Sequence, residues 1–217
     1  MPPDPPAPDL PALVAARICH DLISPLGAIG NGLELLDMLH DKGQPAARAT
    51  PELALVRDSA DAAAARIGFF RIAFGTVRMT ERIVARDLLA MLNAWQSGGR
   101  LTIGWHGDGE LPRPDARLLC LLMACAESAL PRHGRLMVGM HDAPWNRTWS
   151  LTAQGSGLHL DPGLWSMLAP APAPLPADLR PAHVQFALAA RHLHDFGTAL
   201  DWYRAGDTLT IRFSGAA

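Results

Sequence analysis

The sequence lacks a strong charge of either sign. Its 217 residues include 19 Lys and Arg against 21 Asp and Glu, for a formal net charge of −2. Because domains that bind nucleic acid carry a basic surface, this balance argues against a nucleic-acid partner. The chain also lacks an uninterrupted apolar run long enough to span a bilayer, and its N-terminus lacks the basic and apolar regions of a signal peptide. We therefore expect no membrane partner and a cytoplasmic location.

Cysteine is scarce as well. Cys19, Cys120 and Cys125 are odd in number, and each lies in an apolar stretch that reads as helix. This pattern is typical of neither a disulfide framework nor a metal site, so we expect reduced thiols in the core. Hydrophobic residues make up 49% of the chain, which is ample for the core of one large domain or two small ones.

The first segment with a regular pattern follows a proline-rich leader. Residues 1–11 show no hydrophobic periodicity and are predicted to be disordered. A helix is then predicted from about Leu13 to Leu39, and Pro25 is expected to bend it because proline has no backbone N–H to donate. Its apolar seam steps by four and three: Ala15, Cys19, Leu22, Leu26, Ile29, Leu33 and Leu36. Beside the seam lies an outward face made of His20, Ser24, Gly27 and Asn31.

A second helix is predicted after a polar connection at residues 40–49. Thr50 can cap this helix, Pro51 fits its first turn, and Glu52 suits the positive end of its dipole. Its seam runs to about Gly75 and comprises Val56, Ala60, Ala63, Ile67, Phe70 and Phe74.

An isolated hairpin of these two helices cannot bury both seams. Pairing two hairpins into a four-helix bundle solves the problem, so residues 12–80 are predicted to form a homodimer. The alternative is a monomer in which the hairpin packs on the C-terminal half of its own chain.

Residues 81–217 have a different pattern and are predicted to be a second domain. Gly68 and Gly75–Glu81 mark the joint between the halves. Alternating apolar residues predict strands at Arg100–Trp105, near residues 136–140 and 149–151, and in a hairpin of residues 199–203 and 208–213. Helices are predicted at residues 87–95, 114–130 and 183–195. The expected fold is therefore α+β, a helical hairpin followed by a two-layer α/β sandwich.

The stretch Cys19–Ile29 resembles the phosphoacceptor box of bacterial histidine kinases. That box places a histidine, an acidic residue, a hydroxyl and a proline in register, here His20, Asp21, Ser24 and Pro25. Over His20–Leu36 the sequence is most similar to the ChpT-type histidine phosphotransferases, which carry phosphoryl groups between receiver domains. A lone His-Asp pair would be read as ordinary surface residues, but the whole set on one amphipathic helix favours a phosphoacceptor.

The order of elements after Asp87 resembles the ATP-binding domain of histidine kinases. In a working kinase the helix at 115–130 would carry two asparagines, the second of which holds magnesium. This chain has Ala124 and Ser128 at those places. The carboxylate that takes the adenine amino group is replaced by Ala153.

The remaining nucleotide motifs are also incomplete. Gly155-Ser156-Gly157 keeps two glycines of the adenine-binding strand end, a weak signal that fits a simple turn. Pro181–Phe186, at the place of the phosphate-binding glycine box, contains no glycine. Ala169–Pro181 replaces a flexible lid with a segment of five prolines, which tends to be stiff. The resemblance therefore implies a degenerate domain that does not use ATP.

The resemblance also implies a mechanism. Neutral His20 takes the phosphoryl group from the aspartate of a receiver domain, and the expected partners are the receiver domains of a hybrid histidine kinase and of response regulators. A second receiver then takes the group away, and the receiver supplies Mg²⁺ and a lysine. No cofactor or metal is expected on this chain. Asp21 either orients His20 or takes up its proton, or it is simply a solvated helix carboxylate. Ser24 is a candidate for polar contact with the phosphoryl group. Receivers are expected to dock over outward positions where a solvated helix would carry charge: Ile23, Gly27 and Asn31.

Two rival functions follow from the same residues. The first is a non-enzymatic scaffold that binds receivers without phosphoryl flow, and the intact box around His20 argues against it. The second is an active ATP-dependent histidine kinase, which the missing nucleotide motifs disfavour.

Overall fold

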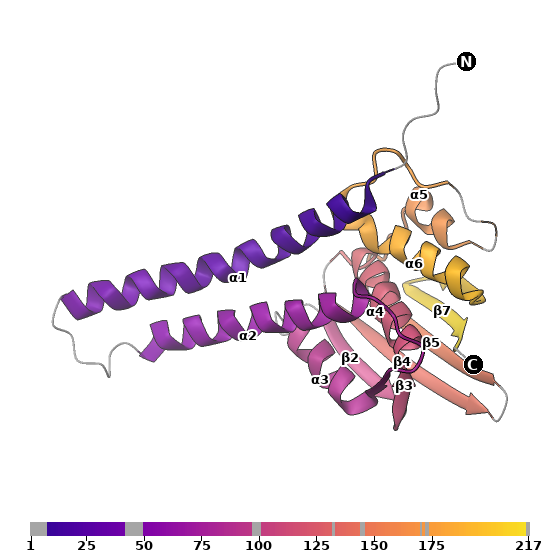
Figure 1. Ribbon diagram of the computed structural model, residues 1–217, viewed down its shortest axis with the longest axis horizontal. Coiled ribbons are helices and arrows are strands. Elements are labelled where there is room, and N and C mark those ends of the chain that lie inside the picture. The colour runs from indigo at the N-terminus through magenta and orange to yellow at the C-terminus, as the bar shows by residue number, and fades with distance from the viewer. Residues whose placement is uncertain are drawn as a thin grey trace, which may run out of the picture.

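Helices α1 (Leu10–Asp41) and α2 (Thr50–Ala73) form an antiparallel hairpin that projects from an α/β sandwich (Figure 1). The computed structural model describes residues 8–41, 50–96, 101–131, 133–143, 146–169, 171 and 174–215. Residues 42–49 of the predicted connection and residues 1–7 of the predicted leader lie outside the described residues, whereas His40 and Asp41, predicted to begin the connection, belong to α1.

Helix α1 begins earlier than predicted. Asp9 caps it, because its Oδ1 accepts a hydrogen bond from the backbone N–H of Ala12 at 3.1 Å. The predicted leader therefore extends too far, since its last residues already belong to the helix. Pro25 lies within α1, which continues through it without interruption, and its ring is buried.

The apolar residues of α1 face in two directions: some pack toward α2 and others face solvent. Between Leu10 and His40 of α1, Pro25 and Gly32 are buried, and they lie on the stripe that meets α2. At Gly32 the helices approach so closely that an added Cβ would lie 2.6 Å from Cγ2 of Val56. Leu26 and Leu33, by contrast, are 57% and 50% exposed. Half of the predicted seam is thus uncovered in the single chain.

One expectation about α1 needs correction. Cys19 is exposed rather than a core thiol, because its position faces away from α2, whereas Cys120 and Cys125 are buried. Residues Leu10–His40 are also long and apolar enough, by length and composition alone, to cross a membrane. No uninterrupted apolar run indicates this span, because Arg17, Asp21 and Glu34 interrupt the apolar residues of the helix. A single helix of this kind is weak evidence of a membrane span.

The sandwich is built on a mixed five-stranded sheet. Its strands are β2 (Leu101–His106), β4 (Gly134–Ala143), β5 (Asn146–Gln154), β6 (Leu200–Ala205) and β7 (Thr208–Ser214). They lie in the order β2-β4-β5-β7-β6, with β2 and β4 parallel and the other pairs antiparallel. The strands predicted from alternation are all present. Two short strands that were not predicted, β1 (Arg82–Val84) and β3 (Glu110–Pro112), pair separately.

Helices cover one face of this sheet, as Figure 1 shows. They are α3 (Ala85–Trp95), α4 (Arg113–Ser128) and α6 (Val184–Phe196), with short α5 (Pro162–Trp165) and the 3₁₀ turns η2 (Ser166–Leu168) and η3 (Pro181–His183) beside them. The inward residues of the strands are almost completely buried: Leu136, Val138, Trp149, Leu151, Leu209, Ile211 and Phe213. The expected two-layer α+β fold is confirmed.

The base of the hairpin belongs to the same core. Phe69 of α2 is 2% exposed and stacks on Trp95 of α3, with ring centroids 4.1 Å apart. Two arginines of α4 bind the carbonyl groups that α2 leaves unpaired at its C-terminus. Arg117 donates to the carbonyl of Ala73 at 3.2 Å, and Arg113 donates to that of Arg71. The two halves are therefore fixed to one another.

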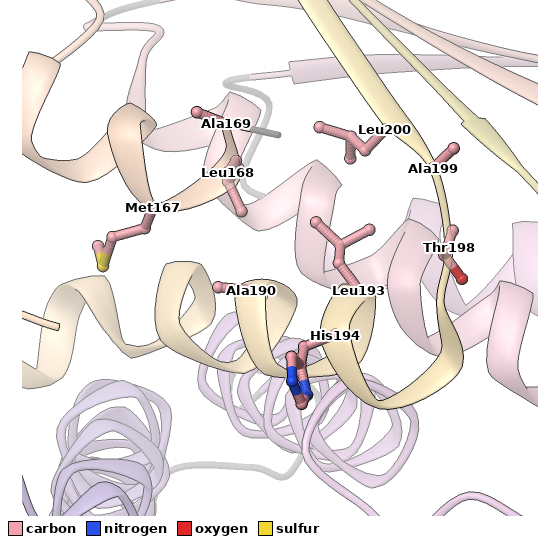
Figure 2. A pocket seen from close by; sticks show the side chains of 9 residues that line it. All are labelled: Met167, Leu168, Ala169, Ala190, Leu193, His194, Thr198, Ala199 and Leu200. Carbon is pink, nitrogen blue, oxygen red and sulfur yellow. The ribbon is translucent and has the colours of Figure 1, made fainter. Parts of the chain in front are cut away.

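A cavity of about 440 Å³ opens between η2, α6 and β6 (Figure 2). Its walls are mostly apolar and include Met167, Leu168, Leu193 and Leu200, with His194 at the rim. The cavity faces the C-terminal part of α6, whereas a phosphate-binding box would precede the N-terminal end of that helix. It therefore does not occupy the place expected for a nucleotide.

Candidate active site

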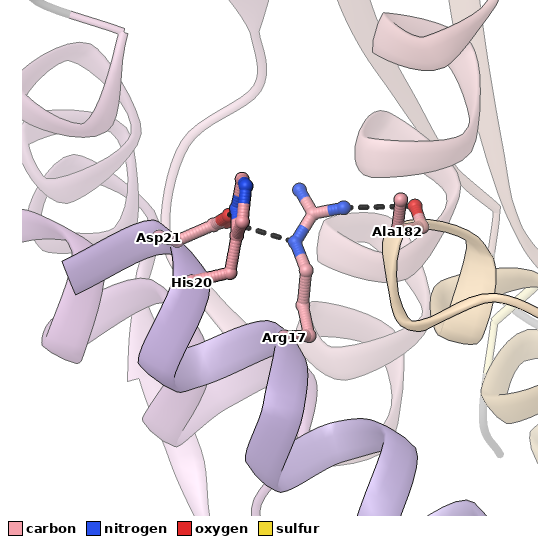
Figure 3. A network of polar contacts seen from close by, with 4 residues as sticks. All are labelled: Arg17, His20, Asp21 and Ala182. Carbon is pink, nitrogen blue, oxygen red and sulfur yellow. Dashed lines mark hydrogen bonds and ion pairs between the residues drawn. The ribbon is translucent and has the colours of Figure 1, made fainter. Parts of the chain in front are cut away.

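His20 lies on α1 near the base of the hairpin, where the helix passes the sandwich (Figure 3). Its side chain is 86% exposed. The imidazole of His20 is thus available to a partner, while the backbone of the residue is held within a long helix. An exposed side chain on a regular helix suits a residue that must be presented in one position.

The carboxylate of Asp21 holds the ring of His20. Oδ1 of Asp21 lies 3.1 Å from Nδ1 of His20, and the aspartate side chain is only 13% exposed. Asp21 is therefore not a freely solvated helix carboxylate, and the geometry favours the alternative in which it orients the histidine. In the tautomer that donates its Nδ1 proton to Asp21, the lone pair is on Nε2.

Arg17 completes this group and was missed in the sequence. Its Nε donates to Oδ2 of Asp21 at 2.8 Å, and its Nη1 donates to the carbonyl of Ala182 at 2.8 Å (Figure 3). The spacing of Arg17 and Asp21, four residues apart on one helix, was a signal for the first contact. The contact with Ala182 has no sequence signal, because the acceptor is a backbone carbonyl 165 residues away.

The other predicted site residues extend along α1 from His20. Ser24, Gly27 and Asn31 are exposed on successive turns, and Ile23 is 68% exposed. A Cβ added at Gly27 would meet no atom within 4 Å. The chain therefore presents an open, uncharged surface here, which a second protein can approach closely.

A cavity of about 490 Å³ separates this part of α1 from the segment before α6. Ala16, Arg17, His20 and Asp21 line one side, and Arg180, Pro181 and Ala182 line the other. Arg180 also lies 3.4 Å from Nε2 of His183. Burial and the nearby Arg180 lower the pKa of His183. The segment that stands at the place of the phosphate-binding box thus presents the guanidinium of Arg180 and the carbonyl of Ala182 on the side of the cavity opposite His20.

The positions of the ATP motifs are filled by packing. Ala153 is fully buried in β5 between Leu136 and Leu209 of the neighbouring strands. Ala124 is 7% exposed on α4. The hydroxyl of Ser128 donates to the carbonyl of Cys125 at 2.6 Å and so stays within its own helix. None of these side chains supplies the amide or carboxylate that a kinase would use.

The retained glycines have a structural explanation. A Cβ added at Gly155 would lie 2.7 Å from Cδ2 of Leu130 and 2.9 Å from the carbonyl oxygen of His133. Gly157 has a φ of 75°, a conformation that favours glycine. Among the described residues, no group of three or more His, Cys, Asp and Glu side chains could hold a metal ion.

Comparisons with known proteins agree with this structure. A family model described as "Histidine phosphotransferase C-terminal domain" matches residues 85–208. Protein phosphotransferase ChpT of Brucella abortus (strain 2308) is 34% identical over 156 residues, which cover 71% of either chain. A solved bacterial phosphotransferase superposes with a TM-score of 0.75 at 27% identity, covering 94% of this chain and 95% of the other. The family resemblance inferred from the sequence is confirmed. This chain belongs to the histidine phosphotransferases, a family of two-component phosphorelay proteins.

Proposed function

We propose that this chain takes a phosphoryl group onto His20 from a receiver-domain aspartate and passes it to the aspartate of a second response regulator. The observation that carries the proposal is the exposed imidazole of His20, whose Nδ1 lies 3.1 Å from the half-buried carboxylate of Asp21. A scaffold would have no use for a histidine oriented in this way.

The transfer uses few groups of this chain. The Nε2 lone pair attacks phosphorus, the bond from phosphorus to the aspartyl oxygen breaks, and the receiver's carboxylate leaves as an anion. The positive charge that develops on the ring faces the carboxylate of Asp21, which stabilises it. The Nδ1 proton remains in that hydrogen bond. Transfer to the second receiver is the reverse reaction with a different aspartate.

The rest of the catalytic machinery belongs to the partner. Phosphoryl transfer depends on positioning and on charge stabilisation, and a receiver would supply Mg²⁺ and a lysine, so this chain binds no cofactor of its own. Docking over Ile23, Gly27 and Asn31 brings the receiver along α1 to His20. Ser24 lies between Ile23 and Gly27 on this surface and contacts the phosphoryl group or a loop of the receiver.

The sandwich does not make phosphohistidine from ATP. Ala153 is buried between leucine side chains, and the hydroxyl of Ser128 is bonded within α4. Both the adenine carboxylate and the magnesium ligand are thus missing, and η3 occupies the place of the phosphate box. The direction of supply is therefore from receiver to histidine.

The active form is a cytoplasmic homodimer built from the hairpins. Leu26 and Leu33 of α1 and Ile67 of α2 are about half exposed, each on a predicted seam. Covering these side chains with a second hairpin removes apolar surface from water and completes a four-helix bundle.

A phosphotransfer assay tests the proposal. The purified chain is mixed with a phosphorylated receiver domain and Mg²⁺, and acid-labile phosphate on the chain is measured over time. The wild type should gain label and then lose it to a second receiver, whereas His20→Ala should bind the receiver with unchanged affinity and gain no label. Labelling of His20→Ala would show that another residue accepts the phosphoryl group. Receiver binding without labelling of the wild type would favour the scaffold.

A further inference from the structure

Arg17 connects the histidine to the C-terminal domain through a continuous chain of contacts. From Ala182 in η3, the carbonyl oxygen accepts from Nη1 of Arg17 at 2.8 Å. Nε of the same guanidinium donates to Oδ2 of Asp21 at 2.8 Å, and Oδ1 of Asp21 lies 3.1 Å from Nδ1 of His20. Each group in the chain uses a different atom for each neighbour, so all contacts exist at once.

We propose that Arg17 is a positioning residue that, through Asp21, fixes which ring nitrogen of His20 accepts the phosphoryl group, and that it ties this choice to the docking of η3 on α1. The inference deepens the proposed function and rests on it. Arg17 does not touch the reacting atoms. It acts on the carboxylate that does contact the imidazole.

Burial shows why the carboxylate needs this support. The side chain of His20 is 86% exposed, so packing does not restrict the rotation of its ring. Asp21 and Arg17 are 13% and 22% exposed, and a charge-assisted contact at this depth is stronger than one in open solvent. Because both ends of the guanidinium are engaged, it holds Oδ2 and thereby directs Oδ1 at Nδ1. The Nδ1–H tautomer is then favoured and Nε2 carries the lone pair.

The position of Ala182 gives the sandwich a role that needs no nucleotide. It belongs to η3, which stands where a phosphate-binding glycine box would precede α6. The cavity of about 490 Å³ separates α1 from this segment, and the Arg17 side chain bridges it (Figure 3). The sandwich, which does not use ATP, thus supports the orientation of His20, the side chain that accepts the phosphoryl group.

The tautomer of His20 is the first measurement, made on the full-length, unphosphorylated protein. Nitrogen-15 chemical shifts of the imidazole distinguish Nδ1–H from Nε2–H. The wild type should show the Nδ1–H form as the majority near neutral pH. Arg17→Met, which keeps the length of the side chain but removes its charge, should shift the population toward Nε2–H. Arg17→Lys, which can reach one acceptor but not two, should fall between them. Arg86→Met, at an exposed arginine of α3, is the matched control and should leave the spectrum unchanged.

The rate of transfer from a phosphorylated receiver is the second measurement. Arg17→Met should slow the single-turnover transfer rate about tenfold or more, since misdirected catalytic groups lose rate steeply, while receiver affinity stays within about twofold. Arg17→Lys should recover part of the rate. Melting curves of each variant exclude global unfolding as the cause.

The outcomes separate this inference from the proposed function. A wild type that takes no phosphate on His20 would defeat the proposed function, yet the tautomer shifts would still decide whether Arg17 controls the ring. If Arg17→Met keeps both the Nδ1–H tautomer and the wild-type rate, the role assigned to Arg17 is wrong. A loss of rate without a change of tautomer also contradicts it, because Arg17 would then act by another route.

Discussion

Nη1 of Arg117 lies 3.3 Å from Nδ1 of His192, inside the contact between α4 and α6. The histidine is 1% exposed and its ring stacks on Phe196. Arg117 also donates to the carbonyl of Ala73 at the end of α2. The neutral imidazole therefore accepts from the same guanidinium that holds the hairpin on the sandwich.

This pair predicts a loss of stability in acid. Burial, reinforced by the charge of Arg117 against an opposing pull from Asp195, lowers the pKa of His192 to about 4 from a usual 6.5. The unfolded chain takes up the proton at the higher pH, so the free energy of unfolding falls as the pH drops from about 6.5 to about 4, by on the order of 3 kcal/mol. Urea melts at several pH values should show this slope. His192→Asn should flatten it, leaving a residual contribution from His183, whose pKa is also lowered. An unchanged slope in His192→Asn would contradict the prediction.

Two glycines of α1 should respond in opposite ways to the same change. Gly27→Ala adds a methyl group where nothing lies within 4 Å, so better helix propensity should raise stability by up to about 1 kcal/mol. Gly32→Ala places its Cβ 2.6 Å from Cγ2 of Val56, so either the Val56 side chain or the helices must move and the melting temperature should fall. Thermal melts of the two variants make the comparison. A rise in both would mean that α1 and α2 do not approach as closely as described.

Mg-ATP should neither bind the chain nor label it. Calorimetric titration with millimolar nucleotide should give no saturable heat, and radiolabelled ATP should leave His20 unlabelled. Ala153→Asp alone should not restore binding. It should instead destabilise the fold, because the new carboxylate would lie between Leu136 and Leu209 without a partner. Saturable binding by the wild type would overturn the view that the domain has lost its nucleotide site.

A charge at Gly27 should block the approach of the receiver. A Cβ added at exposed Gly27 would meet no atom within 4 Å, so Gly27→Arg should keep the wild-type melting temperature within a few degrees, yet it should abolish transfer to His20. The same substitution at Ala90, exposed on α3, provides the control for the added charge. Normal transfer by Gly27→Arg would place the docking surface elsewhere.

A charge on the exposed half of the apolar seam should separate the dimer. Leu26 and Ile67 are 57% and 49% exposed in the single chain, so an aspartate at either place would be tolerated by a monomer. In the four-helix bundle the same charge is buried, and Ile67→Asp should halve the mass measured by light scattering at micromolar concentration. Tyr203→Asp, at a similarly exposed residue of β6, should remain dimeric. A monomeric wild type would rule the bundle out.

The sequence predicted the fold wherever a local pattern carried the information. Alternation at Leu136 and Val138 predicted β4, and the turn residues before Thr208 predicted the hairpin of β6 and β7. Strand β1 was missed because three residues are too few to show alternation. The start of α1 was placed too late because prolines before and within its first turn resemble a leader, although proline is well suited to that position.

In the candidate site, too, the residues that belong to a local sequence pattern were predicted and the others were not. His20 and Asp21 are adjacent and belong to one motif, so they could be identified together. The contact of Arg17 with Asp21 could have been predicted from their spacing of four residues on one helix. The hydrogen bond from Arg17 to Ala182 could not have been predicted. Every residue has a backbone carbonyl, and these two positions meet only after the sandwich has folded against α1.

The arginine contacts at the end of α2 limit how far this protein can be treated as a set of exchangeable modules. Arg113 and Arg117 serve the last carbonyls of α2, and Phe69 is packed against Trp95. A hairpin expressed alone would expose Phe69 and leave those carbonyls without their arginines, and a hairpin grafted onto another protein would lose the contact with Ala182. Chimeras that exchange phosphoacceptor helices between relay proteins should therefore be joined outside this region, with α2, α3 and α4 kept from the same parent.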